Sequence, residues 1–155
     1  AAKYDRKLLI EQGIRAREIE ISVLGNEEPK VSLPGEIYSS SEFYDYKAKY
    51  IDNKSITNIP AELPKEQIEE IQRWAVKAYQ ALECEGFARV DFFIDQDTNK
   101  LYLNEINTLP GFTEISMYPK MWEAAGKSMK ELLKELIDFA ELRFLDCSKN
   151  SIDCE

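Results

Sequence analysis

Histidine is absent from this chain of 155 residues, and its absence removes several kinds of chemistry at once. Ser–His and Cys–His nucleophile pairs are excluded, and so is any metal held by imidazole. The three cysteines, Cys84, Cys147 and Cys154, show no C-x-x-C spacing, which argues against a disulfide framework or a zinc knuckle. Cys84 is expected to be a core residue. Any catalysis must therefore use carboxylates, Lys, Arg and hard metal ions.

Positive charge and long apolar runs are also scarce. The formal net charge is −9, whereas nucleic-acid sites gather Lys and Arg, so we expect no nucleic-acid partner. No apolar run approaches the roughly 20 residues that a membrane span needs, and the N-terminus lacks the hydrophobic segment of a signal peptide. The sequence predicts a soluble, cytoplasmic protein without membrane partners. Because it begins at Ala rather than Met, close to a predicted strand, we expect a fragment of something longer.

The first third of the chain is typical of a sheet. Residues 7–13 and 16–26 read as two strands, and in the second Ile19, Ile21 and Val23 alternate with the polar face of Glu18, Glu20 and Ser22. Residues 29–38 can add a further strand. Residues 39–58 show no sustained period, which predicts a lid or binding loop.

Three helices are predicted in the remainder. The first begins at Pro64 and closes at Gly86, the second covers about 119–125, and Ser128 with Glu131 forms a capping box for the third. The expected core-facing stripe of the first helix is Ile68, Ile71, Ala75, Ala78, Tyr79 and Leu82, and that of the third is Met129, Leu132, Leu133, Leu136, Ile137 and Ala140. The period is lost beyond Arg143, and 147–155 is predicted to be a disordered tail. The pattern predicts an α+β domain with helices covering one face of a mostly antiparallel sheet.

Acids gather at the open end of a predicted hairpin, "DFFIDQDTNKLYLNEIN", residues 91–107. A five-residue turn pairs Asp95 with Leu101 and Phe93 with Leu103, and it places Asp91 opposite Glu105 and Arg89 opposite Asn107. Opposed carboxylates destabilise a sheet unless their charge is offset. A divalent cation would offset it, because Mg²⁺ takes oxygen ligands from one or two carboxylates. The alternative is a surface hairpin whose charges are solvated or bridged by Arg89.

The run "ARVDFFID...LYLNEINTLPGFTEISMYPKMW", with "FYDYKAKY" and "LLIEQGIRAREIEISVLG" upstream, resembles the D-alanine–D-alanine ligases of the ATP-grasp superfamily, up to about Arg143. The resemblance implies that 1–146 is the C-terminal lobe of an ATP-grasp fold, without the N-terminal domain and the lobe that carries the glycine-rich loop. It implies ATP and Mg²⁺ (or Mn²⁺), and D-alanine as substrate. An acyl phosphate forms on the first D-alanine, and the amine of the second attacks it.

The same resemblance assigns roles to residues. The implied metal ligands are Asp91, Glu105 and Asn107, the implied oxyanion donors are Arg89 and the amide of Gly111, and the implied contact to the second substrate is Ser116. The implied lid residues are Lys49 and Tyr50, and the implied nucleotide contacts are Glu11, the backbone of Gln12 and Ile14, and Glu18. Without the resemblance, Gly111 is a turn residue, Ser116 an N-cap, and Lys49 and Tyr50 are solvated. Glu20 is expected to be solvated only.

Other readings remain open. A ligase that takes D-serine or D-lactate as second substrate is one, and a non-catalytic nucleotide- or cation-binding module of the same fold is another. We expect the fragment alone to be inactive, and the full-length protein to be a homodimer.

Overall fold

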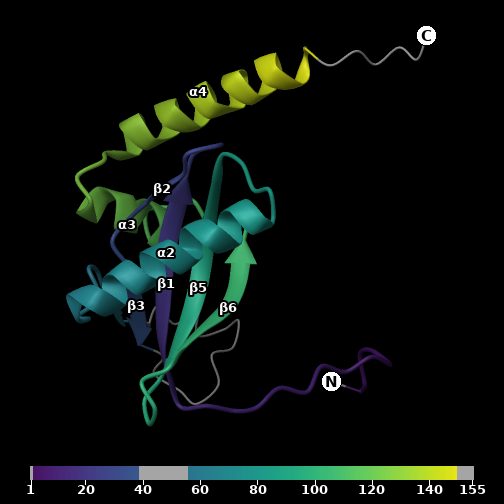
Figure 1. Cartoon of the computed structure of the whole chain (residues 1–155), viewed down its shortest axis with the longest axis vertical. Helices are drawn as coiled ribbons and strands as arrows, with labels where there is room; N and C mark the ends of the chain where they lie inside the picture. The colour runs from purple at the N-terminus through teal and green to yellow at the C-terminus, as the bar shows by residue number, and fades with distance from the viewer. Residues whose placement is uncertain (1, 39–55, 150–155) are drawn as a thin grey trace.

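The computed structural model describes residues 2–38 and 56–149, and within them the chain folds as an antiparallel sheet with three helices (Figure 1). The six strands are β1 (Ala16–Leu24), β2 (Lys30–Val31), β3 (Gly35–Tyr38), β4 (Ile56–Asn58), β5 (Phe87–Asp95) and β6 (Leu101–Asn107). Their order is β4-β3-β1-β5-β6, with β2 also paired to β1. The α+β prediction is confirmed. No helix in the described part of the chain has the length and apolar character needed to cross a membrane.

The main core lies between the sheet and α2 (Lys65–Ala81), which crosses the strands in Figure 1. Ile71, Ala75 and Tyr79 recur every four residues and pack on the apolar face of β1 and β5. The Tyr79 hydroxyl donates to the Gly25 carbonyl at 2.8 Å, which satisfies its one buried polar group. Leu82 does not extend this stripe, because the helix ends at Ala81 and leaves Leu82 64% exposed.

A second core lies on the opposite face, so the prediction of helices on one face only was wrong. The polar face of β1 ends in an apolar residue, Leu24, which packs with Tyr118 and Trp122 of α3 (Met117–Ala124). The Ser22 hydroxyl donates to the Tyr118 carbonyl at 3.1 Å, and the Tyr118 hydroxyl donates to the Val23 carbonyl at 2.9 Å. Because Ser22 is satisfied in this way, a polar strand face can be covered by a helix.

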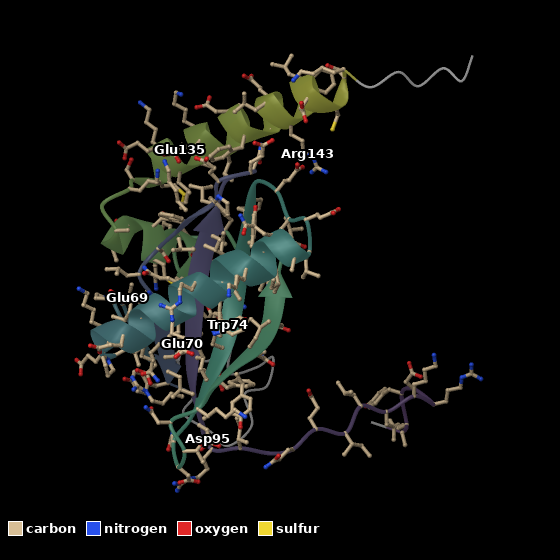
Figure 2. The ribbon with its side chains drawn as sticks, in the orientation of Figure 1. Glu69, Glu70, Trp74, Asp95, Glu135 and Arg143 are labelled. Carbon is tan, nitrogen blue, oxygen red and sulfur yellow. The ribbon has the colours of Figure 1, made fainter. Side chains whose placement is uncertain are left out.

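The last helix, α4 (Met129–Cys147), begins with the predicted capping box between Ser128 and Glu131. Of its predicted core stripe only Leu132 is fully buried, while Leu136 is partly buried against the second core. Figure 1 shows α4 beyond the end of the sheet, so much of its surface faces solvent. Ile137 is 60% and Phe144 is 72% exposed. The helix runs four residues past Arg143, whose side chain pairs with Glu85 (Figure 2). Most of the predicted tail lies outside the described residues.

Two strand predictions also differ from the structure. Residues 7–13 do not form a strand; they run away from the sheet without a strand partner in the described residues (Figure 1). Residues 29–38 form two short strands, because Ser32–Pro34 lies between the part that pairs with the end of β1 and the part that pairs with its middle. Of the predicted loop 39–58, residues 56–58 form β4, and 39–55 lie outside the described residues.

Candidate functional site

Three carboxylates stand in one row on neighbouring strands, from β1 to the edge strand β6. Glu20 of β1 is directly opposite Asp91 of β5, which is directly opposite Glu105 of β6. In the next row, Arg89 lies between Ser22 and Asn107. The predicted pairs of Asp91 with Glu105 and of Arg89 with Asn107 are therefore confirmed.

The route to that register is not the predicted one. The Asp95 amide donates to the Lys100 carbonyl at 3.0 Å, so the turn has four residues rather than five, and Phe93 pairs with Tyr102 instead of Leu103. A bulge then leaves Asn104 without an opposite residue and restores the register at the acids. The predicted pairings of Asp95 with Leu101 and of Phe93 with Leu103 were wrong. Asp95 marks the turn at the far end of the hairpin from the acids (Figure 2).

Arg89 is the buried cation of this site, with 8% of its surface exposed. Its Nε and Nη2 donate to the two oxygens of Asp91 at 2.7 Å each, and Nε lies 3.2 Å from Glu20 Oε2. Burial alone would lower the pKa of Arg89. The hydrogen bonds that Arg89 donates to Asp91 and the charges of Glu20, Asp91 and Glu105 outweigh burial, so its pKa is raised and the guanidinium stays charged.

Glu20 is a site residue that the sequence reasoning missed. It was expected to be solvated, but it is 7% exposed and paired with Arg89. Strand periodicity puts Glu20 on one face with Glu18, but only the observed pairing of β1 with β5 brings it beside Asp91.

The predicted metal ligands offer oxygen atoms only: two carboxylates and the Asn107 amide. In the described ranges, no group of three or more His, Cys, Asp or Glu side chains is arranged to hold a metal ion. Two carboxylates fit Mg²⁺, which keeps several waters and is completed by substrate phosphates. Asn107 Oδ1 also accepts from the Leu109 amide at 3.1 Å, which orients the side chain. This set of oxygen donors fits Mg²⁺ bound together with a phosphate group. When no metal ion is bound, Arg89 bridges Glu20 and Asp91 and offsets their charge.

The predicted nucleotide contacts share one hollow of about 740 Å³ beside the hairpin. Its lining comes from the segment before β1, from β1 itself and from the bulged part of β6, and it includes Glu11, Gln12, Ile14, Glu18, Phe93 and Tyr102. Glu11, Gln12, Ile14 and Glu18, the four predicted nucleotide contacts, thus line the same hollow. Their binding roles stay a prediction.

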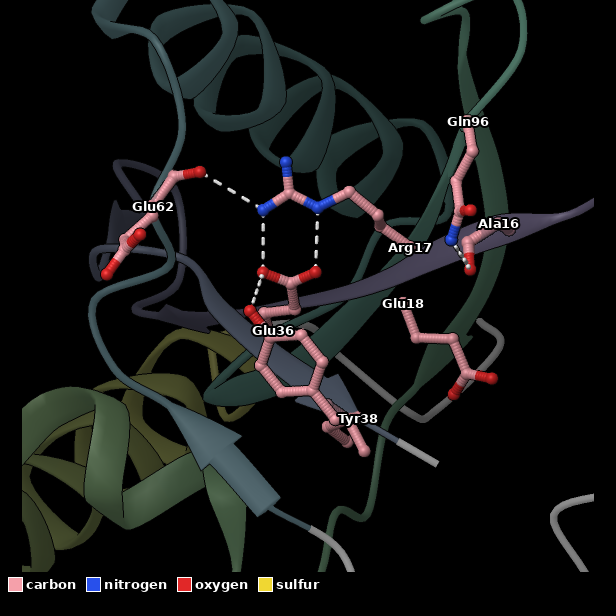
Figure 3. Close-up of a pocket in the computed structure, with 8 residues that line it drawn as sticks. Ala16, Arg17, Glu18, Glu36, Tyr38, Glu62 and Gln96 are labelled. Carbon is pink, nitrogen blue, oxygen red and sulfur yellow. Dashed lines mark hydrogen bonds and ion pairs between the residues drawn. The ribbon is translucent and has the colours of Figure 1, made fainter. Parts of the chain in front are cut away.

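A second hollow, of about 540 Å³, is lined by the ion pair between Arg17 and Glu36, whose charges balance each other (Figure 3). Arg17 donates to both oxygens of Glu36 at 2.7 and 2.6 Å, and the Tyr38 hydroxyl donates to Glu36 at 2.9 Å. Arg17 also donates to the Glu62 carbonyl at 3.0 Å. Glu18 points away from this pair in Figure 3. The cluster acts as a structural brace between β1, β3 and the segment before α2.

Gly111 and Ser116 meet at the start of α3. A Cβ on Gly111 would lie 2.9 Å from Ser116 Oγ, so glycine is required for this close approach. Ser116 occupies the N-cap position, but its side chain makes no cap hydrogen bond and instead accepts from the Thr113 amide at 3.0 Å. Ser116 is thus the N-cap residue, as the alternative predicted, although its hydroxyl does not cap the helix amides. The predicted lid residues, Lys49 and Tyr50, lie outside the described residues.

Comparison with known proteins gives one family. The family model described as "D-ala D-ala ligase C-terminus" matches residues 1–138. The chain is 64% identical over 141 residues to a D-alanine–D-alanine ligase of Thermoanaerobacter sp. (strain X514), covering 90% of this chain and 39% of that protein. It is 58% identical over 146 residues to the same enzyme of Acetivibrio thermocellus, covering 94% and 39%. The chain thus spans about two fifths of the length of these relatives.

Solved structures agree. The D-alanine–D-alanine ligase of Coxiella burnetii superposes with a TM-score of 0.76 at 45% identity, over 90% of this chain and 36% of that one. The VanG D-Ala:D-Ser ligase of Enterococcus faecalis superposes with a TM-score of 0.69 at 38% identity, over 83% and 37%.

Proposed function

Because the chain belongs to the family of D-alanine–D-alanine ligase C-termini, we propose that it is the part of an ATP-dependent ligase that joins two D-alanines for peptidoglycan. The observation that carries the proposal is the pairing of Asp91 with Glu105 beside the buried Arg89. Opposed carboxylates on neighbouring strands repel each other, and a nucleotide-bound cation between Asp91 and the exposed Glu105 would offset that repulsion.

Different residues bind the metal ion and stabilise the oxyanion. Asp91, Glu105 and Asn107 hold Mg²⁺ or Mn²⁺, which when bound neutralises the nucleotide phosphates. Arg89 and the Gly111 amide donate to the oxyanion that develops when the amine attacks the acyl phosphate, a kind of donor whose loss typically costs about 10² to 10³ in rate.

Binding of substrate and nucleotide falls to residues around this centre. Ser116, at the start of α3, binds the carboxylate of the second D-alanine, where helix amides favour an anion. The hollow lined by Glu11, Gln12, Ile14 and Glu18 takes the adenosine of ATP. Lys49 and Tyr50 complete the phosphate and substrate contacts. The full-length protein is proposed to be a cytoplasmic homodimer.

Mn²⁺ binding to the chain tests the metal site, measured from the loss of the free-ion EPR signal. We expect Asp91→Asn and Glu105→Gln each to weaken binding by at least about tenfold, the low end of what losing an outer-shell partner costs. Glu123→Gln, on an exposed part of α3, is the control and is expected to bind as the parent does. Equal binding by parent and both variants would contradict the proposal.

Two further measurements need the intact ligase. Unchanged turnover in Asp91→Asn would favour a non-catalytic module of the same fold. Because the chain also superposes on a D-Ala:D-Ser ligase, a competition between D-alanine, D-serine and D-lactate decides the second substrate. We expect D-alanine to be incorporated preferentially near neutral pH.

A further inference from the structure

Arg89 lies within ion-pair distance of two carboxylates that come from two strands, although one would balance its charge. Asp91, on the same strand, takes two of its N–H groups at 2.7 Å. Glu20, on the neighbouring strand, lies 3.2 Å from its Nε. All three side chains are at least 87% buried, with Arg89 and Glu20 at 9% exposure and Asp91 at 13%. The second carboxylate, Glu20, is therefore not needed to balance the charge of Arg89 and needs another explanation.

The proposed function places two demands on Asp91. Both of its oxygens accept from Arg89, yet the metal site also needs oxygen from Asp91. A cation that draws Asp91 toward itself weakens the pairing with Arg89. Leaving a buried charge without its partner is strongly destabilising, so metal binding would be opposed by the loss at Arg89.

Glu20 removes that opposition because of where the register puts it. It stands on the β1 side of Asp91, whereas Glu105 stands on the β6 side. When Asp91 turns toward Glu105 and the cation, Glu20 stays within reach of the Arg89 guanidinium. We propose that Glu20 is a positioning residue: it keeps Arg89 charged and in place so that Asp91 is free to bind the metal. This inference rests on the proposed function.

The first expected consequence is on metal affinity. In Glu20→Gln, Arg89 depends on Asp91 alone, so Mn²⁺ must compete with it, and we expect binding to weaken roughly three- to tenfold, within the coupling range of residues in one ion-pair network. The loss of a negative charge near the site acts in the same direction. The Arg89→Met background separates the two causes: the effect of Glu20→Gln should fall to within about twofold there if it acts through Arg89.

The second consequence is on Arg89 itself and does not need the Met variant to fold. In ¹⁵N-labelled chain, the Arg89 Nε–H signal, assigned through its loss in Arg89→Lys, reports whether the guanidinium is still paired. In the parent it is expected to persist at saturating Mg²⁺. In Glu20→Gln it is expected to broaden through solvent exchange when Mg²⁺ is added, and to persist without Mg²⁺. Glu123→Gln, the control, should behave as the parent.

The outcomes separate this inference from the proposed function. If Asp91→Asn weakens Mn²⁺ binding but Glu20→Gln does not, the metal site stands and the role of Glu20 is overturned. If the effect of Glu20→Gln is undiminished in Arg89→Met, Glu20 acts by its charge alone, and the role is again overturned. If neither the parent nor any variant binds Mn²⁺ in a way that depends on Asp91, the proposed metal site fails and this inference fails with it.

Discussion

Glu36 is a buried carboxylate, 2% exposed, whose surroundings keep it ionised. Burial would raise its pKa, but the hydrogen bonds from Arg17 and Tyr38 and the charge of Arg17 outweigh burial, and the pKa is lowered. The two N–H groups of Arg17 meet the two oxygens of Glu36 in a fork, the arrangement that makes such pairs strong (Figure 3). The pair fastens β3 to its neighbour β1.

We predict that Glu36→Gln destabilises the domain by about 1–3 kcal/mol at pH 7, the range for hydrogen bonds to charged groups. The lower part of the range is expected because Arg17 is 31% exposed and water partly screens the pair. Urea denaturation of parent and variant measures the difference. Glu123→Gln is the control and should change stability by less than about 0.5 kcal/mol.

The pH dependence of this difference has a definite sign. The pKa of Glu36 is lower in the folded chain than its ordinary value of 4.5, so the pair's contribution is fully present above about 4.5 and is lost as the pH falls through the folded pKa. The stability gap between parent and Glu36→Gln should therefore be constant from pH 7 to about 5 and close at lower pH. A gap that widens on acidification would contradict the argument.

At the scale of the element, the acidic hairpin shows what strand periodicity can and cannot give. Alternation and antiparallel pairing were enough to put Asp91 opposite Glu105. The turn was predicted one residue too long, and the bulge at Asn104 compensated for it. A signal for the bulge was present, because Leu101 and Ile106 both pack toward α2 although they are an odd number of residues apart. A regular strand cannot do this.

The helices were easier to locate than their partners. All three helices of the described residues were predicted within a few positions, since apolar spacing and capping residues are local. Which face is covered depends on tertiary packing. In the predicted stripe of α4, Leu136 is partly buried beside Leu132, whereas Leu133 and Ile137 are exposed. Residues 7–13 have the composition of a strand, yet a strand forms only beside a partner.

The capping box at the start of α4 gives a prediction at this scale. Ser128 Oγ accepts from the Glu131 amide at 3.3 Å, and the Glu131 carboxylate accepts from the Ser128 amide at 2.9 Å. Ser128→Ala should cost about 1 kcal/mol, or roughly 2–4 °C in Tm for a domain of this size. Ser148→Ala, at the other end of the helix, is the control and should lower the Tm by less. A Ser128 variant as stable as the parent would mean that the start of α4 contributes little to the domain's stability.

At the scale of the whole molecule, the site was predictable where residues lie on paired strands. Asp91, Glu105 and Arg89 could be placed together by the hairpin register, whereas Glu20 joins them through the pairing of two strands that are far apart in the sequence. Gly111 and Ser116 could not, because their approach depends on how a loop folds before α3. Their roles, and those of Glu11 and Glu18, came from resemblance to a family, which supplies chemistry that periodicity does not.

The exposed N-terminal stretch bears on what the chain can do alone. Leu9 and Ile10 are 84% and 90% exposed, and they directly precede Glu11, which lines the hollow of about 740 Å³. Exposed apolar side chains next to a hollow are typical of a surface that another part of a protein or a partner covers. The chain spans about two fifths of its relatives, which is consistent with a shared site.

We therefore predict that the 155-residue chain makes no D-alanyl-D-alanine from D-alanine and ATP, while it still binds Mn²⁺ through Asp91 and Glu105. ATP is expected to bind weakly, because a nucleotide that meets one wall keeps much of its surface in water, whereas ligand sites usually bury about 70–90% of their ligand. Dipeptide formation is measured by chromatography and ATP binding by saturation-transfer NMR, with the intact ligase as the positive control. Efficient turnover by the chain alone, near the ~10 s⁻¹ of a typical enzyme, would overturn the prediction and show that this lobe is sufficient for catalysis.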